Sequence, residues 1–209
     1  MAAPEDRSWF GERLKFHLDP YLALTPEQID ELFNHFELLR RWNARINLTS
    51  IRSAEEIVLR HYCESLFVAS VLPEMKSCAD VGSGAGFPGV PLAIFRPECP
   101  VALIESHQRK AVFLRESTRE LKNVRILCER AEDVGEQFDW IVSRAVAPES
   151  VLRLVPTFAE HVALLIGVVD FETMKKDSKI DWYDPVQIPW GAQLLVVTGV
   201  PRGTSNVER

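Results

Sequence analysis

Residues 80–89 carry the spacing that says most about chemistry. The stretch reads Asp-Val-Gly-Ser-Gly-Ala-Gly-Phe-Pro-Gly, so Gly82, Gly84 and Gly86 alternate directly after a short apolar run. Glycine adopts positive φ without steric cost and lets a ligand approach main-chain N–H groups. A dinucleotide fingerprint has the spacing G-x-G-x-x-G. Here the third glycine comes one residue early, and Phe87 stands where that fingerprint needs glycine. The loop therefore predicts a site for a nucleotide-sized ligand that is not a dinucleotide.

Further polar residues follow strand-like apolar runs. Glu105 ends the second run about 20 residues after the loop, the interval at which an acid reaches ribose hydroxyls. Ala131 and Glu132 follow the third run, and residues 143–145 (Ser-Arg-Ala) end the fourth. Because ligands bind beyond the carboxyl ends of parallel strands, we expect these residues to share one crevice with the glycine loop. Each also has an ordinary structural alternative, and Glu132 in particular could cap a following turn.

The elements that must position this crevice follow from the hydrophobic pattern. Short strand-like runs occur at residues 78–81, 101–105, 124–128, 138–142 and 162–166. Helical patterns separate them, most clearly at residues 107–121 and 148–160. Strands that alternate with helices predict an α/β fold with a mainly parallel sheet. Past Gly167 the pattern weakens, although residues 186–189 and 193–198 predict two final strands in a hairpin.

The first third of the chain is predicted to be helical. Residues 25–28 (Thr-Pro-Glu-Gln) form a capping box with proline at the first helical position. Residues 53–56 (Ser-Ala-Glu-Glu) form a second one. We therefore expect an N-terminal helical extension over residues 1–73 and a ligand-binding domain over residues 74–209, packed as one compact unit.

Composition limits the classes of protein to consider. The 209 residues are 46% hydrophobic, which is enough for one domain with a large core. No apolar run is long enough to span a bilayer, and the N-terminus lacks the layout of a signal peptide. The four cysteines are dispersed without a C-x-x-C pair, so buried reduced thiols are expected rather than disulfides or a metal site. These features predict a cytoplasmic protein with no metal and no membrane partner.

Charge is uneven along the chain. A net charge of −6 and a pI near 5.5 argue against non-specific coating of nucleic acid. Two local windows are nevertheless basic, one at residues 40–60 and one at residues 109–130. From charge alone, solvated helix faces are the favoured interpretation of both windows. The first window contains Arg40, Arg41, Arg45, Arg52 and Arg60.

The G-x-G-x-G loop preceded by an acid resembles the first motif of class I S-adenosylmethionine methyltransferases. Over roughly residues 35–150 the chain resembles the ribosomal RNA small subunit methyltransferase G family, also called glucose-inhibited division protein B. The matching pieces are Trp-Asn-x-x-Ile-Asn-Leu-Thr-Ser-Ile at 42–51, His-x-x-x-Ser-Leu at 61–66, the loop and its continuation at 80–92, Lys-Ala-Val-Phe-Leu at 110–114, Arg-Ala-Glu at 130–132 and Ser-Arg-Ala-Val at 143–146. The Gly-Phe-Pro-Gly extension and the Ser-Arg-Ala element are much more specific than a glycine loop alone.

The resemblance implies a Rossmann-like class I methyltransferase fold, with a mainly parallel seven-strand sheet, helices on both faces and an N-terminal helical cap. It implies a monomer that binds S-adenosylmethionine and methylates N7 of a guanine in the 530 loop of bacterial 16S rRNA, whether free or within the 30S subunit or its precursor. By position it implies cofactor contacts at Gly82, Phe87, Ala131, Glu132 and Arg144. The residue pattern adds Asp80, Gly84, Gly86 and Glu105. Arg40, Arg41, Arg45 and Arg52 gain weight as RNA contacts because they adjoin a matched loop.

The residues after the fourth strand fit N7 chemistry by what they lack. Exocyclic-amine methyltransferases usually carry an Asn/Asp/Ser-Pro-Pro-aromatic motif there, and carbon-5 pyrimidine methyltransferases need a cysteine nearby. This chain has Ser-Arg-Ala-Val at 143–146. Guanine N7 has an in-plane lone pair and no proton to lose, so no general base is expected and catalysis would rest on orientation. Arg144 is the predicted orienting residue, with a structural salt bridge as the alternative. For His61 and Trp42 we expect structural roles rather than RNA contacts.

The chain departs from the family pattern in three places. Ile166 stands where the family usually has a lysine before glycine, Glu64 stands where it usually has aspartate, and the region from Val168 is short and poorly matched. Two rival hypotheses remain open: a methyltransferase of the same fold with another substrate, and a non-catalytic RNA-binding or ribosome-binding protein that kept the fold. The N-terminal matches argue against the first, and the absent lysine is the only support for the second. The position of Phe87 and the lack of a Tyr-x-x-x-Lys pattern disfavour a nicotinamide dehydrogenase.

Overall fold

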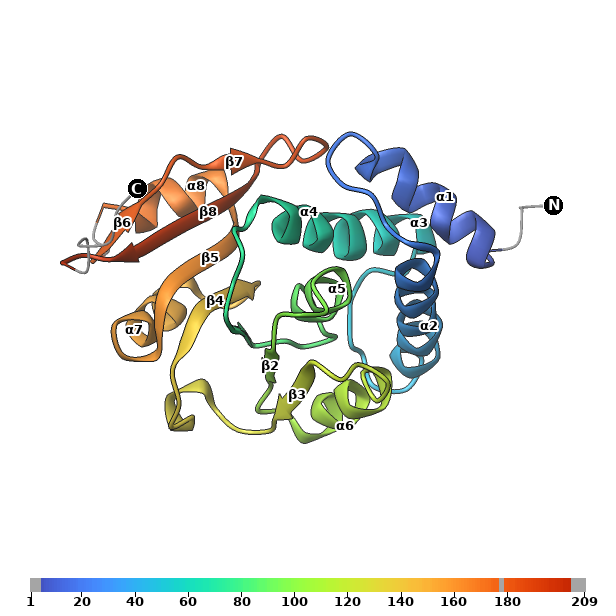
Figure 1. Cartoon of the computed structure of the whole chain (residues 1–209), viewed down its shortest axis with the longest axis horizontal. Coiled ribbons are helices and arrows are strands. Elements are labelled where there is room, and N and C mark those ends of the chain that lie inside the picture. Colours follow the sequence, from blue (N-terminus) through green and yellow to red (C-terminus); the bar gives the residue numbers. More distant parts are fainter. Residues whose placement is uncertain (1–4, 177–178, 204–209) are drawn as a thin grey trace.

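A mainly parallel β-sheet lies at the centre of the molecule (Figure 1). The computed structural model describes residues 5–176 and 179–203. Within them the strands are β1 Cys78–Val81, β2 Val101–Ile104, β3 Val124–Leu127, β4 Phe138–Arg144, β5 Ala159–Gly167, β6 Ile180–Trp182, β7 Val186–Gln187 and β8 Leu194–Pro201. Their order is β3-β2-β1-β4-β5-β8-β6, and β7 pairs with β8. The first five strands in this order are parallel, and β8 is antiparallel to β5, β6 and β7.

Helices cover both faces of this sheet (Figure 1). The α-helices are α1 Arg7–Leu18, α2 Pro26–Asn43, α3 Ala54–Ile57, α4 Glu64–Val71, α5 Gly89–Phe95, α6 Gln108–Ser117, α7 Pro148–Phe158 and α8 Val168–Met174. A π-helix, η1, spans Val58–Cys63, and a 3₁₀ turn, η2, spans Ala131–Asp133. The predicted α/β fold class, with seven strands on one continuous path and helices on both faces, is confirmed.

Alternate strand residues enter two separate apolar cores. On β1, Cys78 belongs to the core shared with α1, α2, α4, α5 and α6, whereas Ala79 belongs to the core shared with α7 and α8. This alternation follows from the pleat, which turns successive side chains to opposite faces. Because both faces are covered, all four residues of β1 are buried, as the continuous apolar runs of the sequence predict for parallel strands.

The predicted helix starts are confirmed. Thr25 accepts a hydrogen bond from Gln28 N (3.2 Å) and the Gln28 side chain accepts from Thr25 N (3.0 Å), which completes the capping box of α2. Ser53 accepts from Glu56 N (3.4 Å) at the start of α3. The helical segment from Ala54 continues to Val71, as predicted, but its middle is a π-helix that the hydrophobic pattern does not indicate.

Several elements differ from the sequence prediction. The weakly patterned ends of the chain contain α1, α8 and β6, none of which was predicted. The helix expected at residues 107–121 ends at Ser117. There the Thr118 hydroxyl donates to Leu114 O (2.8 Å), a local side-chain bond that competes with helix continuation. The predicted C-terminal hairpin is confirmed, since β7 pairs antiparallel with β8.

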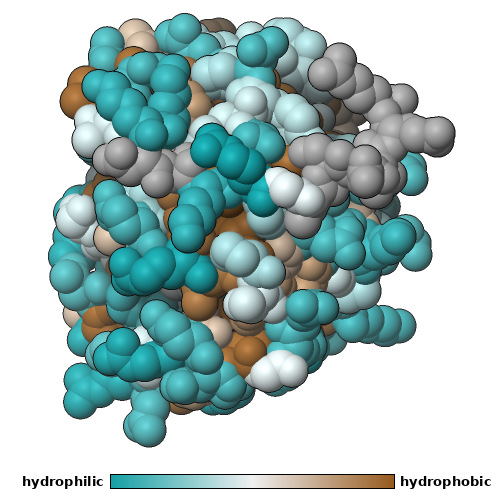
Figure 2. Space-filling model, turned by 90° about the vertical axis from the view of Figure 1, so that its left-hand side faces the viewer, coloured by the Kyte–Doolittle hydropathy of each residue, from teal (hydrophilic) through white to brown (hydrophobic). Residues whose placement is uncertain are grey.

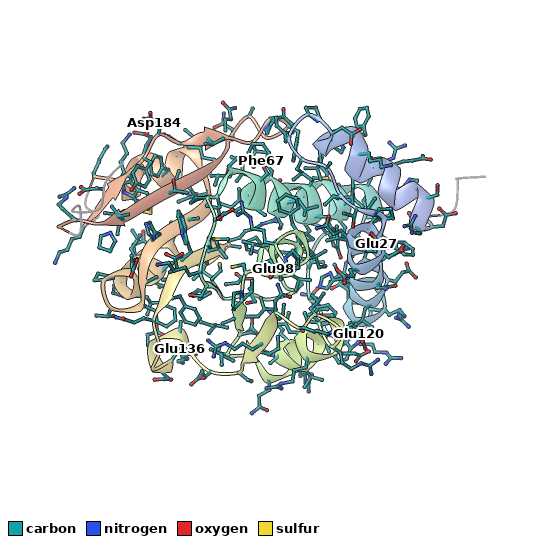
Figure 3. The ribbon with its side chains drawn as sticks, in the orientation of Figure 1. Glu27, Phe67, Glu98, Glu120, Glu136 and Asp184 are labelled. Atoms are coloured by element: carbon teal, nitrogen blue, oxygen red, sulfur yellow. The ribbon has the colours of Figure 1, made fainter. Side chains whose placement is uncertain are left out.

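Aromatic rings connect the C-terminal strands to the N-terminal helices α1 and α4. Trp190, in the turn between β7 and β8, lies 5.8 Å from Phe67 of α4 and 5.7 Å from His17 of α1, measured between ring centroids. Phe67, labelled on α4 in Figure 3, is buried. The last turn of the sheet therefore packs against the N-terminal helices.

On the side of the molecule turned toward the viewer in Figure 2, apolar side chains lie among mostly hydrophilic ones.

The predicted extension over residues 1–73, of which residues 1–4 lie outside the described part, contributes α1 to α4. Their apolar residues share one core with the sheet, and the division at residue 73 stays a prediction. In the described part of the chain, no helix combines the length and apolarity needed to cross a membrane.

Candidate functional site

The glycine loop connects β1 to α5 and turns on left-handed glycines. Gly82, Gly84 and Gly86 have φ angles of 74°, 58° and 90°, a region that residues with a Cβ rarely adopt. The loop is anchored to β2, because Gly82 N and Ser83 N both donate to Ile104 O (3.0 and 3.1 Å). The alternating glycines of the sequence are thus required by the backbone path.

Glu105 holds the loop from the end of β2. Its Oε2 accepts from Gly84 N (2.9 Å) and its Oε1 accepts from His107 N (2.7 Å). The carboxylate is largely buried, with 8% of the residue exposed. Since each carboxylate oxygen accepts more than one hydrogen bond, Glu105 retains acceptor capacity toward a ligand. The predicted site residue is therefore also a structural support of the loop.

Asp80, expected among the cofactor contacts, lies beneath the loop. It is fully buried, and its Oδ2 accepts from Gly89 N (3.0 Å) at the start of α5. Burial raises the pKa of Asp80 from 3.8 to about 7, an effect that the hydrogen bonds from Gly89 and Ser83 oppose. In this structure Asp80 supports the turn into α5 and is not part of the cleft lining, and a direct contact with a cofactor stays a prediction.

A cleft of about 140 Å³ opens at the carboxyl ends of β1, β2 and β4 and beside η2. Four predicted site residues line it: Gly82, Glu105, Ala131 and Glu132. The structure thus brings together residues from three loops, as the strand-end argument predicts. The lining also contains residues that the sequence analysis did not single out: Val81, Ile104, Ser106, Glu129, Arg130, Val146, Ser150 and Leu154.

Val146 is the most informative of these additional residues. A Cβ placed on Gly82 would lie 2.4 Å from Val146 Cγ2, so the loop and the β4 end are in tight contact. The preceding Ala145 has a φ of 60°, which is costly for a residue with a side chain. Ser143 donates through Oγ to Val81 O (2.8 Å) and fastens β4 to β1 at this point. The sequence could have indicated Val146 as a site residue, because the matched Ser-Arg-Ala-Val stretch ends on it.

Phe87, another expected cofactor contact, packs on the opposite side of the loop. Its ring stacks on His61 (4.7 Å between centroids, 18° between planes) and meets Tyr62 edge-on (5.1 Å). His61 Nε2 lies 2.8 Å from Thr49 Oγ1, and burial lowers the pKa of His61 to about 3, so the ring is neutral. The Phe87 side chain is buried and is not part of the cleft lining. His61 has the structural surroundings that were expected, and any contact of Phe87 with a cofactor stays a prediction.

Arg144 reaches toward the helical layer. Its Nη1 donates to Arg60 O and lies 3.4 Å from Glu64 Oε2. The Arg144 side chain is 16% exposed, and it is not part of the cleft lining. The salt bridge that was the weaker alternative in the sequence analysis is therefore present in the structure. An orienting role for Arg144 toward cofactor or guanine stays a prediction.

The four arginines expected to contact RNA are all exposed but differ in their partners. Arg40 is ion-paired with Glu5 (2.7 Å) and Glu37 (3.6 Å). Arg52 donates to Asn47 Oδ1 (3.1 Å). Arg41 lines a separate hollow between α2 and α6, and Arg45 follows the end of α2. The nearby Trp42 packs edge-on against Phe113 of α6 (5.8 Å), as expected for a packing residue.

Two further positions bear on the predictions. Ile166, which stands where the family usually has lysine, is buried in β5 and belongs to the core shared with α7 and α8. At the opposite edge of the sheet, Asp139, Glu160 and His161 bring potential metal-ligating atoms within 4.8 Å of one another. Two of the three are already engaged, since Asp139 Oδ2 accepts from Lys76 N (2.8 Å) and Asp139 Oδ1 lies 3.3 Å from His161 Nδ1.

Comparison with known proteins decides the family. The profile described as rRNA small subunit methyltransferase G matches residues 28–161, more than half of the chain. The chain is also 37% identical over 174 residues to Ribosomal RNA small subunit methyltransferase G of Nitrosomonas eutropha, an alignment that covers 76% of this chain and 80% of the relative.

The chain belongs to the rRNA small subunit methyltransferase G family.

Other members of the family are matched over less of their length. The protein of this name from Roseiflexus sp. (strain RS-1) is 46% identical over 135 residues, which are 60% of this chain and 58% of that protein. The one from Dictyoglomus thermophilum is 36% identical over 159 residues, 70% of this chain and 65% of that protein. The chain thus spans less than two thirds of the length of these two relatives.

Solved structures show that the fold is shared with more distant methyltransferases. Aeropyrum pernix fibrillarin, in complex with natively bound S-adenosyl-L-methionine, matches with a TM-score of 0.52 and 16% identity over 66% of this chain and 73% of that one. The 23S rRNA methyltransferase ErmE matches with a TM-score of 0.53 and 14% identity over 70% of each chain. At these identities the comparison concerns the fold alone.

Proposed function

We propose that this chain is an S-adenosylmethionine-dependent rRNA methyltransferase that methylates N7 of a guanine in the 530 loop of 16S rRNA. The observation that carries the proposal is the family match over residues 28–161, together with a cleft formed within that range by the loop, β2 and η2. Ribosomal RNA as substrate would place the protein in the cytoplasm.

The residues at the cleft fit S-adenosylmethionine. Glu105 offers carboxylate oxygens for ribose hydroxyls, and Ile104, Val146 and Leu154 offer apolar walls for a base. A Cβ on Gly84 would meet only Gly82 O, at 3.8 Å, so the space beside this glycine is open for a ligand that approaches the backbone. Ala131 and Glu132 line the same cleft, and in this proposal their main-chain and carboxylate groups read the adenine edge.

The proposed chemistry asks little of the protein beyond orientation. When bound, S-adenosylmethionine supplies an electrophilic methyl group. The glycine loop and Glu105 would hold S-adenosylmethionine, and Arg144 would orient the cofactor or the guanine at the other end of the site. Guanine N7 carries no proton, so no residue needs to act as a base. The rate of methyl transfer would then depend on how the protein orients the two reactants.

RNA recognition would use the arginines that follow α2. Arg45 lies within the loop at residues 43–49, and Arg52 follows it. In this loop Asn43 Oδ1 accepts from Thr49 N (3.0 Å) and Asn43 Nδ2 donates to Thr49 O (3.1 Å). Such a fixed loop would present both guanidinium groups to phosphates, and binding would weaken as salt increases. Arg40 would contribute less because two glutamates already compete for it.

Two measurements test this proposal. Purified protein is titrated with S-adenosylmethionine by calorimetry, and Glu105→Ala is expected to weaken binding by about tenfold or more, because it removes a charged acceptor from ribose hydroxyls. Glu116→Ala, on α6 away from the cleft, is the matched control and should bind like the unaltered protein. Mass spectrometry of 16S rRNA from cells with and without the gene then identifies the methylated base. Retained N7 methylation in cells without the gene would reject the substrate.

A further inference from the structure

The π-helix η1 leaves one backbone carbonyl for a partner outside the helix. In an α-helix, the N–H of residue 64 would bond to the carbonyl of residue 60. Here Glu64 N donates to Leu59 O and His61 O instead. Arg60 O accepts from Arg144 Nη1, although the two residues are 84 positions apart in the sequence. The extra residue of the π-turn thus provides an acceptor for the guanidinium at the end of β4. Such turns are frequent at functional sites.

Glu64 provides the second contact to the same guanidinium. Its carboxylate is nearly inaccessible, with 5% of the side chain exposed, and Oε2 lies 3.4 Å from Arg144 Nη1. Oε1 lies 3.9 Å from Arg60 Nε. Oε2 forms no hydrogen bond with any described residue, and its ion pair is with the Arg144 guanidinium. A carbonyl and a carboxylate one helical turn apart therefore both contact the same largely buried guanidinium.

This ion pair is poorly explained as a stabilising device. Burial raises the pKa of Glu64, and the charges of Arg144 and Arg60 only partly oppose this. Burial likewise lowers the pKa of Arg144, against the opposing effect of Glu64. For each group, burial affects the pKa more than the partner's charge does, so stability alone does not account for this pair.

The backbone next to Arg144 is also specialised. Ala145 takes the left-handed conformation, with a φ of 60°. On one side of it Arg144 reaches η1, and on the other side Val146 lies against Gly82 and lines the cleft. Strained residues persist where the surroundings over-determine them, and they cluster at functional sites. The π-turn, the buried carboxylate and the strained alanine all meet at Arg144.

We infer that Glu64 is a positioning residue: with the π-turn carbonyl of Arg60, it sets the guanidinium of Arg144 for orienting the substrates. This inference rests on the proposed function, in which Arg144 orients one end of the site. Glu64 itself is not among the residues that line the cleft. Glu64 acts through the charged side chain of Arg144. The geometry of the site would therefore depend on a residue outside the cleft.

The direct test uses nitrogen NMR of the full chain without ligand. A guanidinium held by a carbonyl and a carboxylate should give slowly rotating Nη signals, assigned to Arg144 by their loss in Arg144→Gln. Glu64→Gln should abolish or shift those signals, and Glu64→Asp, which restores the charge, should recover them at least in part. Glu56→Gln, an exposed glutamate of α3, is the matched control and should leave them unchanged. Unchanged signals in Glu64→Gln would overturn the inference.

Kinetics then separate positioning from stability. Glu64→Gln is expected to lower the methylation rate at saturating substrates by about tenfold or more, with S-adenosylmethionine affinity changed by less than about threefold. Glu64→Asp should recover most of the rate. On an Arg144→Gln background, Glu64→Gln should cost nothing further, because its effect passes through Arg144. The inference would be overturned if the two substitutions lowered the rate additively. It would also be overturned if Glu64→Gln lowered the melting temperature but left the methylation rate unchanged.

These outcomes also separate the inference from the proposed function. If the unaltered protein neither binds S-adenosylmethionine nor methylates RNA, the proposed function fails, while the NMR comparison still decides whether Glu64 holds Arg144. If the protein methylates RNA and Arg144→Gln leaves the rate unchanged, methylation stands and the positioning role is rejected.

Discussion

The two sides of the glycine loop are built in different ways. The cleft side, formed by Gly82, Glu105, Ala131 and Val146, is open and offers main-chain and carboxylate groups. The cap side, formed by Phe87, His61, Tyr62 and Glu64, is buried and consists of aromatic rings and one ion pair. One short motif therefore has an open face, where we propose that the ligand binds, and a buried face that packs against the N-terminal helices. Substitutions on the two sides should therefore fail in different ways.

The largest expected effect is on stability, from the cap side. Phe87→Ala removes a buried ring that contacts His61, His35 and Tyr62. Such truncations cost about 3–5 kcal/mol of unfolding free energy, because a cavity adds to the lost transfer energy. Urea unfolding monitored by circular dichroism measures this cost. A loss below about 1 kcal/mol would mean that the ring is not part of the rigid wall.

On the cleft side, Gly82→Ala should mainly affect binding. The new Cβ would lie 2.4 Å from Val146 Cγ2, and the backbone has a φ of 74°. Overpacking of this kind costs about 1–3 kcal/mol, and the shifted loop should weaken S-adenosylmethionine binding by about tenfold or more in calorimetry. Val146→Ala, added to Gly82→Ala, should recover part of the affinity because it relieves the clash. No recovery in the double variant would assign the whole loss to backbone strain.

A smaller and pH-dependent effect is expected beneath the loop. The pKa of Asp80 is raised from 3.8 to about 7, chiefly by burial and to a lesser degree by the nearby Glu105. Between these pH values the folded protein keeps a proton that the unfolded chain has lost, so this group makes stability fall as pH rises toward 7. Asp80→Asn has no such titration and keeps an acceptor for Gly89 N. The melting temperature of Asp80→Asn relative to the unaltered protein should rise by up to about ten degrees from pH 4 to pH 7. Parallel melting curves across this range would contradict the assignment.

The local parts of the fold were predictable because they depend on short-range chemistry. The capping box at Thr25 and the alternating glycines at 82–86 directly predict the local backbone conformation. The order of strands and helices in the matched region also follows from the hydrophobic period. Elements with weak periodicity, such as α1 and β6, escaped prediction because tertiary packing rather than local pattern stabilises them.

The candidate site was predictable only in part. Placing Gly82, Glu105, Ala131 and Glu132 in one cleft needs only the rule that parallel strands end at the same edge. The rule does not say which way a side chain turns. The packing of the Phe87 ring, which the family resemblance implied as a cofactor contact, against His61 and Tyr62 could not be predicted in this way.

By itself, the sequence determined a parallel α/β sheet, a glycine loop at its carboxyl edge and the family to which the chain belongs. Only the tertiary structure decided that Asp80 is buried, that η1 is a π-helix and that Arg144 meets Glu64 and Arg60 O. The physical reason is the range of the forces involved. Backbone period and turn chemistry act between neighbours, whereas burial and the pairing of groups many positions apart exist only after the helical layer has packed on the sheet.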